Sequence, residues 1–361
     1  MVTGEKKLFI SLCDFKSESF DENLLNYATP SVLGQLFMNR MAAIAYGILK
    51  EKKLLNKVNR EFRNSLKMAY DSNVAKNNQY FDCLKYLDSI LCSSDVNYAL
   101  LKGAVLCKEY PDGYRTSNDV DILVSPEDIT AIGDTLIKNG FIQGYIRNGV
   151  FIPATRKEII ESRMMRGETV PYIKDMGMEY MKYLEVDINF SLDYKNSDSN
   201  ALVKMLDNNI TKVYDGFNVR TLNDIDFFIH LCAHLYKEAT TIAWVKMNRD
   251  MTIYKYCDIY MLLNKMDAEN TVELFKRADT LGLSEVCAYV VLHTAALFEI
   301  NNTAAIGMAK DILAQDTDFI HRVISPTDKK ILTYSQKDIF ERFFMDDRIN
   351  DLKEVNENEK N

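Results

Sequence analysis

The chain has 361 residues, of which 47% are hydrophobic and 27% charged, values that are ordinary for a folded globular protein and exclude a disordered or fibrous one. Its formal net charge of -8 argues against a broad basic surface for duplex DNA. The seven cysteines form no CxxC pair, and no run approaches the roughly 18 apolar residues of a membrane span, so we expect a cytoplasmic protein with reduced thiols and no membrane or duplex-DNA partner. Its length predicts two or three domains, or one domain with large appendages.

Helices are predicted over about residues 20–97. In residues 31–54, apolar side chains such as Leu33, Leu36 and Phe37 recur at spacings of three and four, which places them on one face of a helix. A second helical run covers residues 59–91. Polar residues then follow, and the apolar spacing changes to the short runs expected of strands.

A strand, a turn and a helix are predicted next. Residues 120–124, VDILV, form a short β-branched run typical of a buried strand. Ser125 is the expected N-cap of the following helix, with Pro126 at its first position and Gly140 at its end.

A second strand is predicted at residues 183–192. Before it, Thr155 and Glu158 have the spacing of a capping box, which marks the start of another helix. The sequence YLEVDINFSL then alternates, with one predicted core face and one predicted polar face. The core face would carry Leu184, Val186, Ile188 and Phe190, and the polar face Glu185, Asp187, Asn189 and Ser191.

The remainder of the chain is predicted to be mainly helical. A hairpin is expected around Asp215 and Gly216, because an Asp-Gly pair favours a tight turn between strands. Residues 351–361 look like solvated chain. Helices are predicted at residues 223–239, 244–264, 268–281, 284–299 and 303–314.

Three acidic residues on the two predicted strands suggest a metal site. Asp119 and Asp121 lie two residues apart, so their side chains project from the same face of one strand. Asp187, on the polar face of the other strand, can join them. Hard cations such as Mg²⁺ prefer oxygen ligands and often bind through carboxylates and substrate phosphates. Two such ions can activate an attacking oxygen and stabilise a leaving pyrophosphate.

Residues that precede the acids have the chemistry of a triphosphate site. Lys102 supplies a point charge, and Gly103 allows close approach of the backbone to a phosphate. Arg115 lies in the loop that enters the strand and is a second candidate for a phosphate or base contact. Ser117 can orient either group.

These residues together resemble a known family. The stretch LLKGAVLCKEYPDGYRTSNDVDILV, followed by LEVDINF, is similar to the nucleotidyltransferase superfamily typified by DNA polymerase beta, and within it to the bacterial uncharacterised nucleotidyltransferases. By that resemblance, Gly103 matches the triphosphate loop, Asp119 and Asp121 match the metal-binding pair, and Asp187 matches the third carboxylate. The chain departs from the pattern at Asn189, where related sequences often have a histidine.

The resemblance implies a fold and an activity. The fold class is α+β, with a small mixed β-sheet nucleotidyltransferase core at residues 98–195, an N-terminal helical region at 1–97 and a C-terminal helical region at 196–361. The activity is Mg²⁺-dependent (or Mn²⁺-dependent) transfer of an NMP from a nucleoside triphosphate such as ATP, with release of pyrophosphate. The acceptor is a hydroxyl of a small molecule, a protein or an RNA end. The family also suggests that His234 and Lys237 face the nucleotide or the acceptor.

Two other functions fit the acids. An Asp-x-Asp pair also serves glycosyltransferases that use a nucleotide sugar, but these have a nucleotide-binding sheet ahead of the motif, where this chain is predicted to be helical. A catalytically inactive protein that keeps the nucleotide-binding fold as an interaction module is the second alternative. Nucleotide binding without transfer to any acceptor would favour it.

Overall fold

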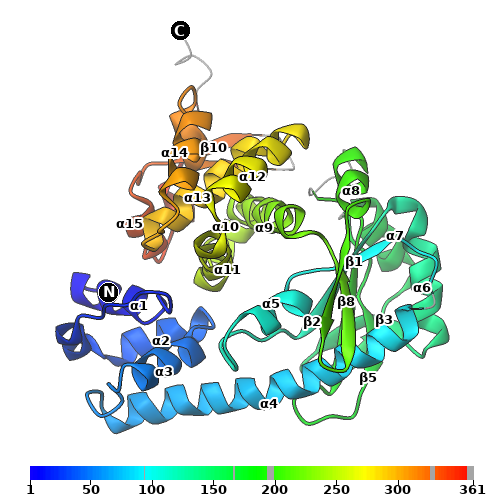
Figure 1. The fold of residues 1–361 in the computed structure, drawn as a ribbon, viewed down its shortest axis with the longest axis horizontal. Coiled ribbons are helices and arrows are strands. Elements are labelled where there is room, and N and C mark those ends of the chain that lie inside the picture. The colour runs from blue at the N-terminus through cyan, green and yellow to red at the C-terminus, as the bar shows by residue number, and fades with distance from the viewer. Residues whose placement is uncertain (93, 166, 193–198, 326–329, 356–361) are drawn as a thin grey trace. The chain divides into compact units, whose positions relative to one another are not determined.

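The computed structural model describes residues 1–92, 94–165, 167–192, 199–325 and 330–355, and it divides the chain into two compact units. Unit 1 consists of Met1–Lys67 and Phe228–Asn361, and unit 2 of Met68–Phe227. The chain passes between the units inside two helices, α4 (Arg60–Leu91) and α9 (Asp224–Ala239), which are labelled in Figure 1. The region boundaries expected near residues 97 and 195 stay a prediction.

A six-stranded mixed sheet forms the centre of unit 2. Its strands, in spatial order, are β1 (Tyr98–Leu100), β2 (Asp119–Val124), β6 (Tyr183–Asn189), β5 (Tyr172–Asp175), β3 (Ile142–Arg147) and β4 (Val150–Pro153). Only the pair β2 and β6 is parallel, and the other neighbours are antiparallel. The predicted α+β class with a mixed sheet is therefore confirmed.

Helices and a hairpin make up the rest of unit 2. They are α5 (Gly103–Glu109), η2 (Pro126–Asp128), α6 (Ile129–Lys138), α7 (Arg156–Met165), α8 (Ser199–Leu206) and the hairpin of β7 (Ile210–Tyr214) and β8 (Phe217–Thr221). Figure 1 shows the C-terminal part of α4 crossing the direction of the strands. The hydroxyl of Tyr80, on α4, donates to the carbonyl of Asp119 at 2.9 Å, so this helix is attached directly to β2.

Unit 1 is mostly helical, with one small sheet. Its helices are α1 (Thr3–Ser11), η1 (Glu22–Tyr27), α2 (Pro30–Met38), α3 (Ala42–Glu51), α10 (Ile242–Lys246), α11 (Ile253–Lys265), α12 (Ala268–Thr280), α13 (Ser284–Leu297), α14 (Thr303–Ile312), η3 (Thr317–His321), α15 (Ile339–Phe343) and η4 (Ile349–Asp351). The sheet has the order β11 (Leu352–Glu354), β10 (Ile331–Tyr334) and β9 (Arg322–Ile324). Within the described ranges no single helix is both long and apolar enough to cross a bilayer, and α2 with α3 passes that test only as a pair bent by 117°.

Arg342 of α15 is almost fully buried in unit 1 between two imidazoles. Its Nη1 lies 3.1 Å from Nδ1 of His321 and its Nη2 2.8 Å from Nε2 of His293. Because guanidinium groups only donate, both ring nitrogens must accept, and both imidazoles must be neutral. Burial and the Arg342 charge lower the pKa of His293 well below its ordinary value and lower the pKa of His321 to about 4.

Most of the strongly periodic segments fold as predicted. Strand β6 alternates between partly exposed and buried residues, and Gly216 forms the hairpin turn with a φ of 84°. The capping box at Thr155 is also present, since the Glu158 carboxylate accepts from the Thr155 backbone at 2.7 Å and the Glu158 backbone donates to the Thr155 hydroxyl at 3.3 Å.

Two predictions about elements are wrong. The single helix expected at residues 244–264 is broken into α10 and α11, because Asn248 adopts a left-handed conformation with a φ of 53° that ends the first helix. The tail expected to be solvated from residue 351 instead contributes β11, which pairs with β10. Residues 356–361 lie outside the described residues.

Candidate active site

The three predicted acids meet on one face of the sheet in unit 2. Asp121 on β2 is the register partner of Asp187 on β6, and Asp119 is the partner of Glu185. Because neighbouring strands in register present paired residues on the same side, all four carboxylates share one face. The structure thus brings Asp119, Asp121 and Asp187 together as the sequence predicts.

Mutual repulsion is strong within this group of acids. Burial, reinforced by the carboxylates of Asp121 and Asp119, raises the pKa of Asp187 well above its ordinary value. Burial and the same two neighbours also raise the pKa of Glu185. Glu168, which lies in a bridge to Asn189 beside the end of β6, adds to the effect on Asp187. Carboxylates held this close favour a cation among them.

Lys102 supplies one such cation. Its Nζ donates to Oδ1 of Asp121 at 2.8 Å, and its backbone has a φ of 46°, an uncommon conformation for a residue with a side chain. Burial works to lower the pKa of Lys102, but the Asp121 carboxylate, with Asp119 and Asp187, more than offsets it and raises the pKa. The Lys102 ammonium is therefore a charged counter-ion of the acids.

Gly103 lies directly against Ser117, which fixes one end of β2. A Cβ atom at Gly103 would be 2.4 Å from Cβ of Ser117, a distance that real Cβ atoms do not show. The Ser117 hydroxyl in turn donates to Oδ1 of Asp119 at 2.8 Å. The glycine predicted for phosphate approach is thus also required so that the serine that orients Asp119 can pack against it.

The chemical type of these acidic ligands suits a hard divalent cation. Three carboxylates from adjacent strands provide oxygen ligands of the type that Mg²⁺ and Mn²⁺ prefer. Within the described part of the chain, however, no three His, Cys, Asp or Glu side chains are arranged as a preformed metal site. One reason is visible at Asp121, whose Oδ1 accepts from Lys102 and, at 3.2 Å, from the amide of Asn189.

Of the other predicted contact residues, Arg115 lies in the loop before β2, and His234 and Lys237 lie in the other unit. The Arg115 guanidinium donates to the carbonyl of Thr116 at 2.5 Å, in the loop before β2. His234 and Lys237 are on the part of α9 that belongs to unit 1, where His234 lies 3.3 Å from the Glu238 carboxylate. A nucleotide contact from either residue stays a prediction.

Three residues near the acids were not predicted as contributors. Tyr80 is fully buried and holds the backbone at Asp119, Asn189 donates to Asp121, and Glu168 acts on Asp187 electrostatically. Asn189 was identifiable as a polar residue on the same face of its strand. Tyr80 and Glu168 carried no signal, because their proximity depends on how α4 and the segment before β5 pack.

The helical segment ahead of β1 bears on the glycosyltransferase alternative. That function needs a nucleotide-binding sheet before the Asp-x-Asp pair. Among the described residues before Tyr98, the chain forms α1 to α4 and η1 and contains no strand. The fold therefore disfavours this alternative.

Comparison with known proteins gives the family. Residues 30–299, most of the chain, match the family described as uncharacterised nucleotidyltransferase. The chain belongs to this family. Among curated proteins, none matches this chain. Among solved structures, it is similar to an antigenic nucleotidyltransferase-like protein from Paracoccidioides brasiliensis, with 15% identity, a TM-score of 0.33 and coverage of 63% of this chain and 95% of that one.

Proposed function

We propose that this protein transfers an NMP from a nucleoside triphosphate to an acceptor hydroxyl and depends on Mg²⁺ or Mn²⁺. In this reaction the acceptor oxygen bonds to the α-phosphorus, the bond between the α-phosphorus and its bridging oxygen breaks, and pyrophosphate leaves. The observation that carries the proposal is the register of β2 and β6, which pairs Asp121 with Asp187 and puts Asp119 on the same face. Membership of a nucleotidyltransferase family supports it.

The proposal gives each acidic residue a task. Asp119, Asp121 and Asp187 would hold the divalent cation, which when bound neutralises phosphate charge and lowers the pKa of a hydroxyl. Asp187 would also be the residue that receives the proton of the acceptor hydroxyl. Ser117 keeps Asp119 in place through its 2.8 Å hydrogen bond.

The basic residues would bind the triphosphate. Lys102 lies at the start of α5 and carries a positive charge beside Asp121, so its ammonium is available to an anionic phosphate once the acids have another counter-ion. Gly103, the next residue, and Arg115, in the loop before β2, are further candidates for a phosphate contact. Catalysis would then come mainly from positioning and charge neutralisation.

The test uses labelled nucleotides. The full-length protein is incubated with Mg²⁺, each α-labelled NTP in turn and a cell lysate as the source of acceptors, and both pyrophosphate release and label transfer are followed. Asp119→Asn and Asp121→Asn should each lower transfer at least about 100-fold, because each removes a charged ligand. The labelled molecule would identify the acceptor.

A matched control separates this result from general damage. Asp134 is an exposed carboxylate on α6 of the same unit, and Asp134→Asn should transfer label at the wild-type rate. Wild-type protein that binds NTP but labels no molecule in any lysate would favour the inactive binding module instead. Equal transfer by wild type and Asp121→Asn would refute the assigned site.

A further inference from the structure

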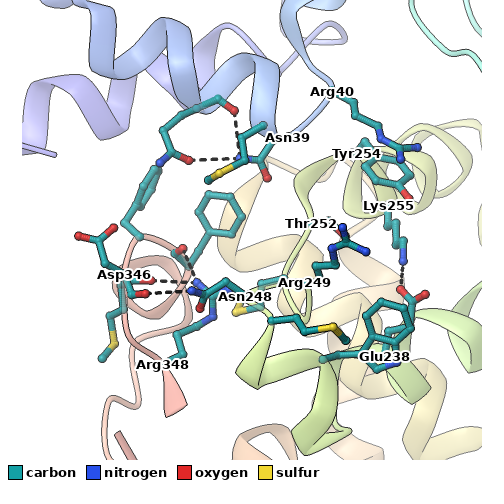
Figure 2. Close-up of a pocket in the computed structure, with 18 of the residues that line it drawn as sticks. Asn39, Arg40, Glu238, Asn248, Arg249, Thr252, Tyr254, Lys255, Asp346 and Arg348 are labelled. Carbon is teal, nitrogen blue, oxygen red and sulfur yellow. Dashed lines mark hydrogen bonds and ion pairs between the residues drawn. The ribbon is translucent and has the colours of Figure 1, made fainter. Parts of the chain in front are cut away.

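A cavity of about 810 Å³ lies entirely within unit 1, and its lining includes Glu238, the partner of His234. Its walls come from the end of α2, the connection between α10 and α11, and the residues after α15, as Figure 2 shows. Its volume lies inside the range of roughly 300–1,000 Å³ that is typical of small-molecule sites. Neither the sequence motifs nor the proposed transfer reaction assigns it a role.

The charges that line the cavity favour an anion. Lys255 pairs with Glu238, and Arg348 pairs with Asp250 at 2.7 Å. Among the described residues, no carboxylate lies within ion-pair distance of Arg40 or Arg249. Figure 2 shows both guanidinium groups in the same part of the cavity as Tyr254 and Lys255, with Asp346 on the opposite side. Both arginines are exposed, so a ligand in solution can reach their guanidinium groups.

The remainder of the lining combines polar side chains with aromatic and methionine side chains. The guanidinium of Arg40 lies 5.1 Å from the ring centre of Tyr254, which keeps that arginine in place by a cation–π contact. Trp244 and Phe344 supply further aromatic surface, and five of the sixteen methionines line the same space. Methionine side chains adapt to irregular ligands. The cavity thus combines an apolar wall with an anion-binding side.

We propose that this cavity binds an organic phosphate monoester with an aromatic body, the chemistry of a mononucleotide. A phosphate monoester carries a charge near -2 at neutral pH, which matches the two guanidinium groups better than a single carboxylate would. Arginine can contact two phosphate oxygens at once. The aromatic body would lie against Trp244 and Tyr254. This site does not depend on the proposed transfer reaction or on its acids.

The only tryptophan of the chain makes the site directly observable. Trp244 lines the cavity, so its fluorescence, excited selectively over tyrosine, reports on this cavity. Titration of the full-length protein with AMP should give a saturable change with half-saturation below about 1 mM. Adenosine lacks the phosphate and inorganic phosphate lacks the aromatic body, so each should bind at least about ten-fold more weakly.

Two variants test the arginines, and a third is their matched control. Arg249→Met and Arg40→Gly should each weaken AMP binding at least about ten-fold. Arg40 has a φ of 60°, a conformation that glycine adopts without strain, so Arg40→Gly should fold normally. Lys53 is an exposed cation outside the cavity with a φ of 58°, and Lys53→Gly should bind AMP like the wild type.

The possible outcomes separate this site from the acids of unit 2. Asp121→Asn should leave the Trp244 response to AMP unchanged, even if it abolishes nucleotidyl transfer. The proposal is overturned if AMP gives no saturable response, if adenosine binds as tightly as AMP, or if both arginine variants bind AMP as the wild type does.

Discussion

Asp187 is the residue at which the requirements of function and stability conflict most. It lies opposite Asp121 on the paired strand and near Glu185, and its raised pKa shows that a negative charge there is unfavourable in the folded protein. A folded state that disfavours the charge is less stable at pH 7 than it would be with a neutral side chain. Such a cost is common at functional sites.

Neutralising Asp187 should therefore stabilise the protein. In EDTA at pH 7, Asp187→Asn is expected to raise the free energy of unfolding, because burial and the carboxylates of Asp121 and Asp119 disfavour the charge that the amide removes. Urea unfolding followed by circular dichroism measures this change. Asp134→Asn, which removes an exposed charge, should stay within about 0.5 kcal/mol of the wild type. If Asp187→Asn were less stable than the wild type, the negative charge of Asp187 would not be destabilising the folded protein.

At this scale the sequence predicts the acids but not their surroundings. The spacing of Asp119 and Asp121, and the alternation around Asp187, follow directly from the geometry of strands. The ion pair of Lys102 with Asp121 does not, because it depends on the unusual backbone conformation of Lys102. The contact of Gly103 with Ser117 likewise depends on how two segments pack.

At the scale of elements, the segments with clear periodicity and turn chemistry could be predicted. The hairpin of β7 and β8 and the alternation of β6 rely on local signals. The three strands β9, β10 and β11 are only three or four residues long, so they offer too few positions for a pattern. Residues 335–351, which include α15 and η4, separate β10 from β11, so no tight-turn signal indicates that these two strands pair.

Two glycines should respond oppositely to the same substitution. Gly216 has a φ of 84°, so Gly216→Ala should lower the free energy of unfolding by about 1 kcal/mol or more. Gly34 lies in the middle of α2 with nothing within 4 Å of an added Cβ, so Gly34→Ala should raise it by about 0.5–1 kcal/mol. Thermal unfolding of both variants measures the difference. The same sign in both would contradict this account of the hairpin turn.

At the scale of the whole molecule, acid should weaken unit 1 through its buried histidines. His321 has a pKa of about 4 when folded and an ordinary value near 6.5 when unfolded, so the unfolded chain takes up the proton first. The stability that neutral His321 contributes is present above pH 6.5 and is lost as the pH falls towards 4. Arg342 and Lys337 oppose protonation, and Asp318 favours it.

This pH dependence can be measured in unit 1 alone. Denaturant unfolding followed by Trp244 fluorescence should show the free energy of unfolding falling by on the order of 1–3 kcal/mol between pH 6.5 and 4. His321→Asn keeps an acceptor for Arg342 but cannot be protonated, so its loss should be smaller. An identical loss in this variant would assign the effect to other groups.

The parallel pairing of β2 with β6 also governs when the acids first meet. Residues 125–182, which include α6, α7 and the strands β3, β4 and β5, separate the two strands in the sequence. Because parallel neighbours need such a crossover, their contact has a high sequence separation and forms late. During synthesis on the ribosome, β2 is made before β6. Of the two strands that neighbour β2 in the sheet, only β1 precedes it in the sequence. The nascent chain encounters the repulsion between the acids of β2 and those of β6 only after β6 has emerged.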